Sequence, residues 1–312
     1  MQAVQYAQYG DPDVLRLVEV ADPEPGPGQV RIALRAASVI PADWKLRAGH
    51  LKQYFPVSFP KIPGRDGAGV VTKLGSGVDY IAVGTPVCVV AQHMEPGTYA
   101  QAIVRDRESI VPLPRNLGFE EGAALMHAGV CAWICLVETA QLRPGMRLLV
   151  HGGAGAIGGL AVQLARHLGA HVAATCRADN VGYVREMGAD EVVAYDREDF
   201  AGISRDFDVA LDLIGGDVHR RSYPVLKRNG HMVCLIAAPF ENRAAEFGVR
   251  VTTPRIHDSR YALDAVGDLA ARGVLRPQIC ARMDLAQAAE AHRRLEANAV
   301  TRGRIVLRIP PS

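Results

Sequence analysis

The pattern of hydrophobic and polar residues changes near residue 120 and predicts two kinds of architecture in one chain. Before that point, residues 30–35 alternate with period two, as a half-buried strand does. Apolar runs at residues 69–71 and 87–90 predict further strands, and frequent Pro and Gly residues separate them. This part therefore predicts a β-rich, barrel-like domain of roughly 110 residues.

Beyond residue 120, short apolar runs alternate with amphipathic helical patterns. One helix is predicted by apolar residues at helical spacing that end before Gly169, namely Ile157, Leu160, Ala161, Leu164, Ala165 and Leu168. Strands are predicted at residues 148–150, 172–175, 192–195, 209–213 and 232–236. This alternation predicts a doubly wound parallel sheet, so the fold class is α/β.

The tail carries a helical pattern over residues 284–297 and a final strand over residues 304–309. We expect residues 1–120 to form the β-rich domain and residues 121–260 to form a Rossmann domain that binds a nucleotide. Residues 261–312 are expected to return to the first domain.

A glycine-rich loop lies between a predicted strand and the amphipathic helix. Gly153, Gly155 and Gly158 have the GxGxxG spacing, which gains weight from this strand–loop–helix context. Missing side chains let backbone N–H groups reach a pyrophosphate, and the helix N-terminus adds partial positive charge. The sequence therefore predicts a dinucleotide site formed by Gly152, Gly153, Gly155, Ala156, Ile157 and Gly158. The alternative is a glycine turn that holds no ligand.

The end of the next strand bears on the choice between NAD and NADP. It reads Thr175-Cys176-Arg177, without the acidic residue that binds the ribose hydroxyls in NAD enzymes. The Arg177 guanidinium has the donors to pair with a 2′-phosphate. Asp179 is a rival acidic residue, but we interpret it as the N-cap of a helix that begins near Val181. NADP is therefore the favoured cofactor.

The amino-acid composition excludes several classes of protein. The 312 residues are 49% hydrophobic and 22% charged with a net charge of +2, which excludes global disorder. Such a balance offers no electrostatic footprint for nucleic acid or for an anionic membrane. No run approaches ~18 apolar residues and the first residues lack a signal-peptide core, so we expect a cytoplasmic protein.

Six scattered cysteines form no CxxC pair, and Cys131 and Cys135 are expected to be buried in a helix.

Six motifs occur in family order at residues 63–71, 97–100, 128–133, 151–165, 188–192 and 303–306. With them the chain resembles the zinc-independent quinone oxidoreductase (zeta-crystallin-like) branch of the medium-chain dehydrogenase/reductase superfamily. The resemblance implies a GroES-like catalytic domain, a Rossmann domain that binds NADPH, and a homodimer. It also implies that Tyr195 helps to hold the 2′-phosphate and that Cys131 lines the nicotinamide. We expect further cofactor contacts from Thr175, Leu235 and Ile236.

The residues at the family's zinc positions predict a reaction without a metal. Residues 37–44 contain no thiol, and Arg65 replaces a His ligand with a group that has no lone pair to offer. Without a Lewis acid, hydride transfer favours a quinone or an α,β-unsaturated carbonyl, because the charge spreads onto an oxygen as a phenolate or enolate. The small-molecule partner is thus an electrophile of this class.

The family pattern does not supply the proton donor, because Ile40 stands where family members often carry Asn. Asp43 and Tyr54 are the catalytic candidates, with Asp43 alternatively capping a helix that begins at Trp44 and Tyr54 alternatively a rim residue. The other polar candidates are Lys45, His93 and His127. Two alternative functions stay open, an enoyl-thioester reductase and a cofactor-binding protein without turnover.

Overall fold

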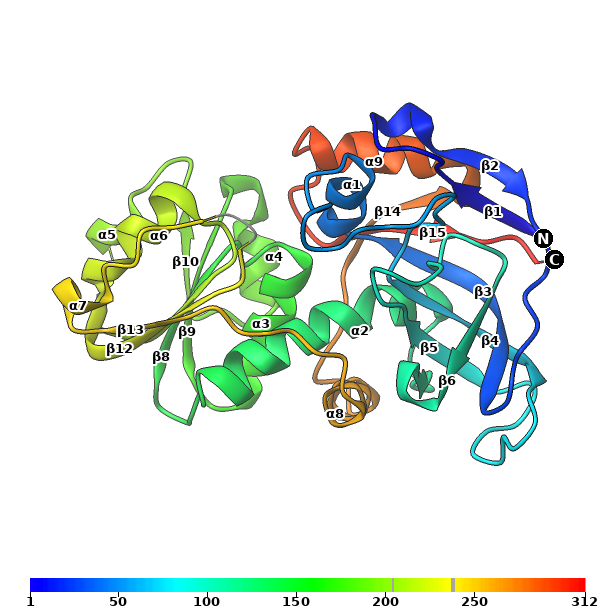
Figure 1. Ribbon diagram of the computed structural model, residues 1–312. Coiled ribbons are helices and arrows are strands. Elements are labelled where there is room, and N and C mark those ends of the chain that lie inside the picture. The colour runs from blue at the N-terminus through cyan, green and yellow to red at the C-terminus, as the bar shows by residue number, and fades with distance from the viewer. Residues whose placement is uncertain (204, 237–238, 312) are drawn as a thin grey trace. The chain divides into compact units, whose positions relative to one another are not determined.

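The computed structural model describes residues 1–203, 205–236 and 239–311, and the chain divides into two units (Figure 1). Unit 1 comprises residues 1–127 and 258–312, and unit 2 comprises residues 128–257. Both chain ends therefore belong to unit 1, where the N- and C-termini lie close together (Figure 1). The unit boundaries lie a few residues from the predicted positions at 120/121 and 260/261.

Unit 1 is rich in β-structure, as its alternating pattern predicts. Its strands are β1 (Gln2–Gln5), β2 (Arg16–Glu19), β3 (Gln29–Val39), β4 (Asp66–Leu74), β5 (Pro86–Val90), β6 (Ala102–Asp106), β7 (Ile110–Pro112), β14 (Ile279–Asp284) and β15 (Arg304–Arg308). Its helices are α1 (Pro41–Arg47), α8 (Arg260–Ala271) and α9 (Ala288–Glu296), with short 3₁₀ turns at Pro12–Val14, Arg107–Ser109 and Leu285–Gln287. The principal sheet has the order β14-β15-β3-β4-β5-β7, β6 pairs with β3, and β1 pairs with β2.

Strand β3 is the centre of unit 1. It pairs with β4, β6 and β15, and Val30, Ile32 and Leu34 are fully buried on its core face. Burying one such side chain contributes about 1.5–3 kcal/mol. The period-two prediction for residues 30–35 is confirmed. The C-terminal strand β15 completes the same core through Ile305 and Leu307, which is why the tail belongs to unit 1.

Unit 2 contains the predicted doubly wound sheet. Its strands are β8 (Arg147–His151), β9 (His171–Cys176), β10 (Glu191–Ala194), β11 (Phe207–Asp212), β12 (Leu226–Cys234) and β13 (Arg250–Thr252). Its helices are α3 (Ala156–His167), α4 (Val181–Glu186), α5 (Phe200–Ile203), α6 (Gly216–Ser222) and α7 (Ala244–Phe247), with 3₁₀ turns at Ala178–Asn180 and Tyr223–Val225. The sheet has the order β10-β9-β8-β11-β12-β13 and is parallel throughout, which is the 3-2-1-4-5-6 order of a Rossmann sheet. The predicted fold class is confirmed.

Helix α2 (Phe119–Trp133) continues as a π-helical segment, Ile134–Thr139. Together they form one helical stretch long and apolar enough to cross a membrane, but most of it is buried, as in the core helix of a soluble protein. Cys131 and Cys135 are 2% and 0% exposed, which confirms their predicted burial.

Candidate functional site

The glycine loop has the tight geometry that its sequence predicts. Strand β8 ends at His151, and α3 begins at Ala156 after Gly155, which has no side chain to cap the helix. Gly152 adopts φ = +76°, and a Cβ at Gly158 would lie 2.1 Å from the Gly152 carbonyl oxygen. Only a bare backbone permits this approach. The first N–H groups of α3 have no intrahelical acceptors, as at the start of every α-helix. The loop therefore fits a diphosphate.

Thr175 ties the loop to β9. Its carbonyl oxygen accepts the Gly153 N–H (2.9 Å), and its Oγ1 accepts the Gly152 N–H (3.3 Å). Oγ1 also lies 3.2 Å from Nδ1 of His151, whose pKa burial lowers to about 4. Thr175 is 3% exposed, so these hydrogen bonds to the loop are shielded from water.

Arg177 and Tyr195 follow the carboxyl ends of two paired strands. Cys176 and Ala194 are partners in the β9–β10 register, and the Tyr195 N–H donates to the Cys176 carbonyl oxygen (3.0 Å). Both side chains are exposed, Tyr195 by 54%. The parallel register therefore places Arg177 and Tyr195 at one corner of the sheet.

The predicted N-cap role of Asp179 is wrong. Asp179 lies within a 3₁₀ turn, and Asn180 precedes α4 without a side-chain capping bond. The sequence pattern had no signal for this turn, which inserts three residues between β9 and α4. A further acid, Asp196, accepts the Ala178 N–H through Oδ1 (2.8 Å) at the same corner.

The remaining predicted cofactor residues of unit 2 lie in two places. Leu235 and Ile236 are half-buried just after β12, because the strand ends at Cys234, two residues before its predicted end. A Cβ at Gly215 would lie 3.1 Å from Cδ1 of Ile236, so this segment packs against the turn after β11. Cys131 lies packed in α2, and its contact with nicotinamide stays a prediction.

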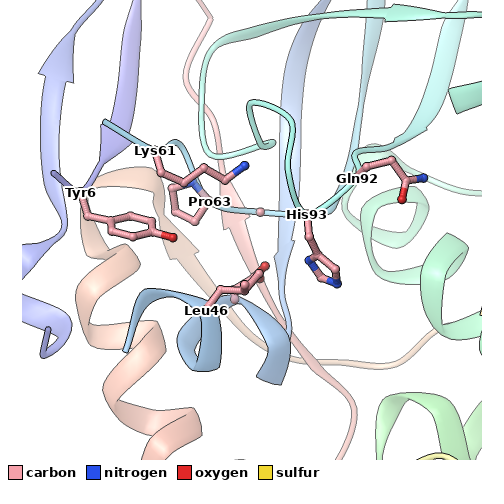
Figure 2. Close-up of a pocket in the computed structure, with 8 residues that line it drawn as sticks. Tyr6, Leu46, Lys61, Pro63, Gln92 and His93 are labelled. Carbon is pink, nitrogen blue, oxygen red and sulfur yellow. The ribbon is translucent and has the colours of Figure 1, made fainter. Parts of the chain in front are cut away.

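Unit 1 contains a pocket in which several polar groups converge. It is lined by Tyr6, Asp43, Leu46, Lys61, Pro63, Gly64, Gln92 and His93. Figure 2 shows Tyr6, Lys61 and His93 arranged around it, with Leu46 contributed by α1. Convergent polar groups with perturbed pKa values in a concavity are typical of a binding or active site.

Asp43 is the buried acid of this pocket. It is the third residue of α1, which begins at Pro41 and not at Trp44 as predicted. Its Oδ2 accepts the Ile40 N–H (2.9 Å) and the Tyr99 hydroxyl (3.1 Å). Burial raises the pKa of Asp43 to about 7, although these two hydrogen bonds favour the carboxylate. Asp43 therefore binds the N-terminal backbone of α1 and also lines the pocket.

Lys61 is a pocket residue that sequence reasoning missed. It is 6% exposed, and its ammonium group donates to the Glu95 carbonyl oxygen. Burial lowers the pKa of Lys61 to about 8, and the positive charge of Arg105 acts in the same direction. Nothing in its neighbouring sequence distinguishes Lys61 from a surface lysine.

Of the other candidate proton donors, only His93 is among the residues that line this pocket. His93 lines the pocket, where burial and the charge of Arg65 lower its pKa to about 3. Tyr54 is 69% exposed and is not among the lining residues, so its catalytic role stays a prediction. Lys45 lies over the Trp44 ring at 5.8 Å, and His127 Nδ1 lies 3.7 Å from Asp258.

A second group of polar side chains is buried in unit 2. The Nδ1 and Nε2 atoms of His219 lie 2.9 Å from Asp212 Oδ2 and 3.0 Å from the Tyr223 hydroxyl, and Cys234 Sγ is 3.6 Å from Nδ1. The Asp212, His219 and Cys234 atoms are close enough together to hold a metal ion. Both ring nitrogens nevertheless have hydrogen-bond partners, so the cluster is complete without one.

Comparison with known proteins gives consistent results. Residues 26–147 match the alcohol dehydrogenase GroES-like domain, and residues 187–307 match the zinc-binding dehydrogenase model. The chain is 34% identical over 249 residues to the chloroplast envelope quinone oxidoreductase homolog of Arabidopsis thaliana, covering 77% of this chain and 76% of the relative. It is 34% identical over 247 residues to the NADPH-dependent alkenal/one oxidoreductase of the same organism, covering 76% and 63%. The Escherichia coli quinone oxidoreductase complexed with NADPH superposes with a TM-score of 0.89 at 27% identity, covering 99% and 100% of the two chains.

The residues at the family's zinc positions do not fit zinc. The Arg65 guanidinium is buried against the Asp258 carboxylate, which also accepts from Gln92 Nε2 (3.1 Å). Asp66 is paired with Arg304 at 2.6 Å. Guanidinium groups cannot coordinate a metal, and the two carboxylates already balance them. The geometry and the similarities together show that the chain belongs to the quinone oxidoreductase family of the medium-chain dehydrogenase/reductase superfamily.

Proposed function

We propose that this protein transfers hydride from NADPH to a quinone or an α,β-unsaturated carbonyl without a metal. The observation that carries the proposal is the bare glycine loop, with Arg177 and Tyr195 at the neighbouring strand ends. Its relatives include a quinone oxidoreductase homolog and an alkenal/one oxidoreductase named for its use of NADPH. Bound NADPH would supply the hydride.

Unit 2 would hold the cofactor. The N–H groups of Ala156, Ile157 and Gly158 would bind the diphosphate, while Arg177 and Tyr195 would bind the 2′-phosphate through charge-assisted and hydroxyl hydrogen bonds. Gly152, Gly153 and Gly155 let the backbone approach, and Thr175 holds the loop against β9. Cys131, Leu235 and Ile236 would supply apolar contacts.

The pocket of unit 1 would supply the groups that complete the reaction. Hydride addition to the β-carbon of an enone leaves an enolate, whose oxygen charge the Lys61 ammonium would stabilise. Protonated Asp43 would then donate its proton to the α-carbon and would later regain one from water. With a quinone, the same hydride and proton yield the hydroquinone.

An NADPH oxidation assay tests this function. The purified protein is offered quinones, enones and an enoyl thioester, with and without a metal chelator, and the absorbance of NADPH is followed. We expect oxidation with a quinone or an enone at a rate that the chelator leaves unchanged. Preference for the thioester would favour the enoyl-thioester reductase, and NADPH binding without oxidation across the panel would favour a cofactor-binding protein without turnover.

We further propose a cytoplasmic homodimer with no nucleic-acid or membrane partner. The family resemblance supports the dimer, and the near-balanced charge supports the absence of polyanionic partners. Light scattering after gel filtration measures the mass of the assembly directly. Twice the chain mass of 33.5 kDa supports the dimer, and the chain mass alone contradicts it.

Replacing Arg177 by Gln is expected to lower the preference for NADPH over NADH. The variant loses the guanidinium that we assign to the 2′-phosphate, a contact worth about 1.5–3 kcal/mol, or roughly tenfold to a hundredfold in the KM for NADPH. The KM for NADH should remain unchanged, because NADH has no phosphate there. Steady-state kinetics with both coenzymes check this, and an equal change in the two KM values would contradict the assigned role.

Replacing Lys61 by Met is expected to lower kcat about tenfold with NADPH binding unchanged. Met keeps most of the buried volume but removes the ammonium that would stabilise the oxyanion. Because the pKa of Lys61 is about 8, kcat of the parent protein should carry a component that declines above pH 8. The exposed Lys52→Met variant is the control. Loss of that component only in Lys61→Met supports the role, and an unchanged pH profile contradicts it.

A further inference from the structure

Unit 2 contains a second pocket, at the edge of the sheet opposite to the glycine loop. Its lining includes Met146, Asp208, Lys227, Arg228, His231 and Arg250. Met146 precedes β8, Asp208 is near the start of β11, and Arg250 is the first residue of β13. Because these strands are parallel, the pocket lies at their amino ends, about 17 Å of strand away from the loop.

An irregularity in β12 builds the rim of this pocket. Phe207 pairs with Leu226 and Val209 pairs with His231, so residues 227–230 bulge opposite a single residue of β11. Asn229 adopts φ = 65° within the bulge, and its N–H donates to the Gly248 carbonyl oxygen (2.7 Å). Bulges of this kind redirect side chains and are common beside functional sites.

Positive charge predominates around the pocket. Lys227 is paired with Asp208 at 2.8 Å. Arg228 and Arg250 are exposed, and in residues 1–203, 205–236 and 239–311 neither has a carboxylate within ion-pair distance. Two guanidinium groups are thus available to an anion that enters.

The buried side chain of His231 is evidence that the pocket binds a ligand. It is 4% exposed, its Nε2 lies 2.9 Å from Thr252 Oγ1, and its Nδ1 is buried with no hydrogen-bond partner in the described part of the chain. Burial and the charge of Arg250 lower its pKa, so the ring is neutral near pH 7. A buried polar atom without a partner costs free energy, and a ligand atom in the pocket would remove that cost.

We propose that this pocket binds a small oxyanion of the phosphate class. In the proposed arrangement the Thr252 hydroxyl donates to Nε2 of His231, so that the ring proton is on Nδ1 and Nδ1–H donates to an anion oxygen. Arg228 and Arg250 supply charge-assisted hydrogen bonds from the rim. Inorganic phosphate and a phosphate monoester share this chemistry, and the site is separate from the one that would hold the 2′-phosphate of NADPH.

The test measures phosphate and β-glycerol phosphate binding to the whole protein by calorimetry at constant ionic strength. Four forms are compared: the parent, Arg228→Gln, Arg250→Gln and Arg177→Gln. We expect each of the first two substitutions to weaken binding at least about tenfold, the loss expected for one charge-assisted hydrogen bond. Arg177→Gln should bind as the parent does. Tighter binding of one anion identifies the source of the ligand as free phosphate or a monoester.

Nitrogen-15 NMR of the His231 ring gives a readout that does not depend on the substitutions. The Nδ1–H tautomer is expected, with an Nδ1 shift on adding phosphate. Binding lost in Arg177→Gln but kept in Arg228→Gln and Arg250→Gln would assign the anion to the cofactor site and overturn the proposal. An Nε2–H tautomer that phosphate leaves unchanged would overturn it as well. Either result leaves the proposed reductase activity untouched.

Discussion

A Gly158→Ala variant is expected to bind NADPH about a hundredfold more weakly than the parent protein, the loss of one or two charge-assisted hydrogen bonds. The added Cβ would lie 2.1 Å from the Gly152 carbonyl oxygen and 2.8 Å from its carbonyl carbon. Both are backbone atoms, so the loop has to open. Opening moves the N–H groups at the start of α3 away from the diphosphate.

The adjacent residue provides the matched control. Gly159 is also in α3, but a Cβ there meets its nearest atom at 3.6 Å, an ordinary contact. Gly159→Ala should therefore keep the parent affinity and gain about 0.5–1 kcal/mol of helix stability. NADPH fluorescence titration gives the two affinities, and circular dichroism confirms that both variants fold. Equal affinities in the two variants would show that the loop does not hold the cofactor.

The nucleotide unit was predictable because its signals are local. The strand, the glycine loop and the periodic helix follow one another within residues 147–167, so sequence spacing alone places the N–H groups. Details that depend on contacts with other segments of the chain could not be predicted from the sequence. The 3₁₀ turn after Arg177 and the bulge in β12 have no periodic signature, so Asp179 was wrongly predicted to be a cap and the part of β12 before Met232 was not predicted.

The pocket of unit 1 was predictable only in part, because its residues come from distant segments. Asp43 is an acid in a loop that the family resemblance singles out, but its hydrogen-bond partner Tyr99 is 56 residues away in the chain. Lys61 is perturbed by burial and by Arg105, and neither effect can be seen in its neighbours along the chain. The start of α1 was missed because Ile40, the residue before it, cannot cap a helix through its side chain.

Replacing Asp43 by Asn is expected to lower kcat by a factor of about 10²–10⁴, the usual contribution of a general acid. The Asn carbonyl oxygen can still accept from the Ile40 N–H and the Tyr99 hydroxyl, so the start of α1 is preserved. In the parent protein kcat should fall as the pH rises through about 7, because the acid must be protonated to donate. The variant should lose that step while its affinity for NADPH stays the same.

The same substitution is expected to stabilise the protein in alkaline solution. The pKa of Asp43 is about 7 in the folded chain against an ordinary 3.8, so the folded state binds the proton more tightly than the unfolded state does. The resulting stability is fully present below pH 3.8 and is lost as the pH rises through 7, a difference on the order of 4 kcal/mol. Asn carries no charge to bury, so thermal unfolding should show Asp43→Asn above the parent at pH 8 and close to it at pH 4. Asp79→Asn, the same substitution at an exposed residue, is the control. An inactive variant that is also less stable at pH 8 would mean that Asp43 serves α1 as a charged cap and supplies no proton.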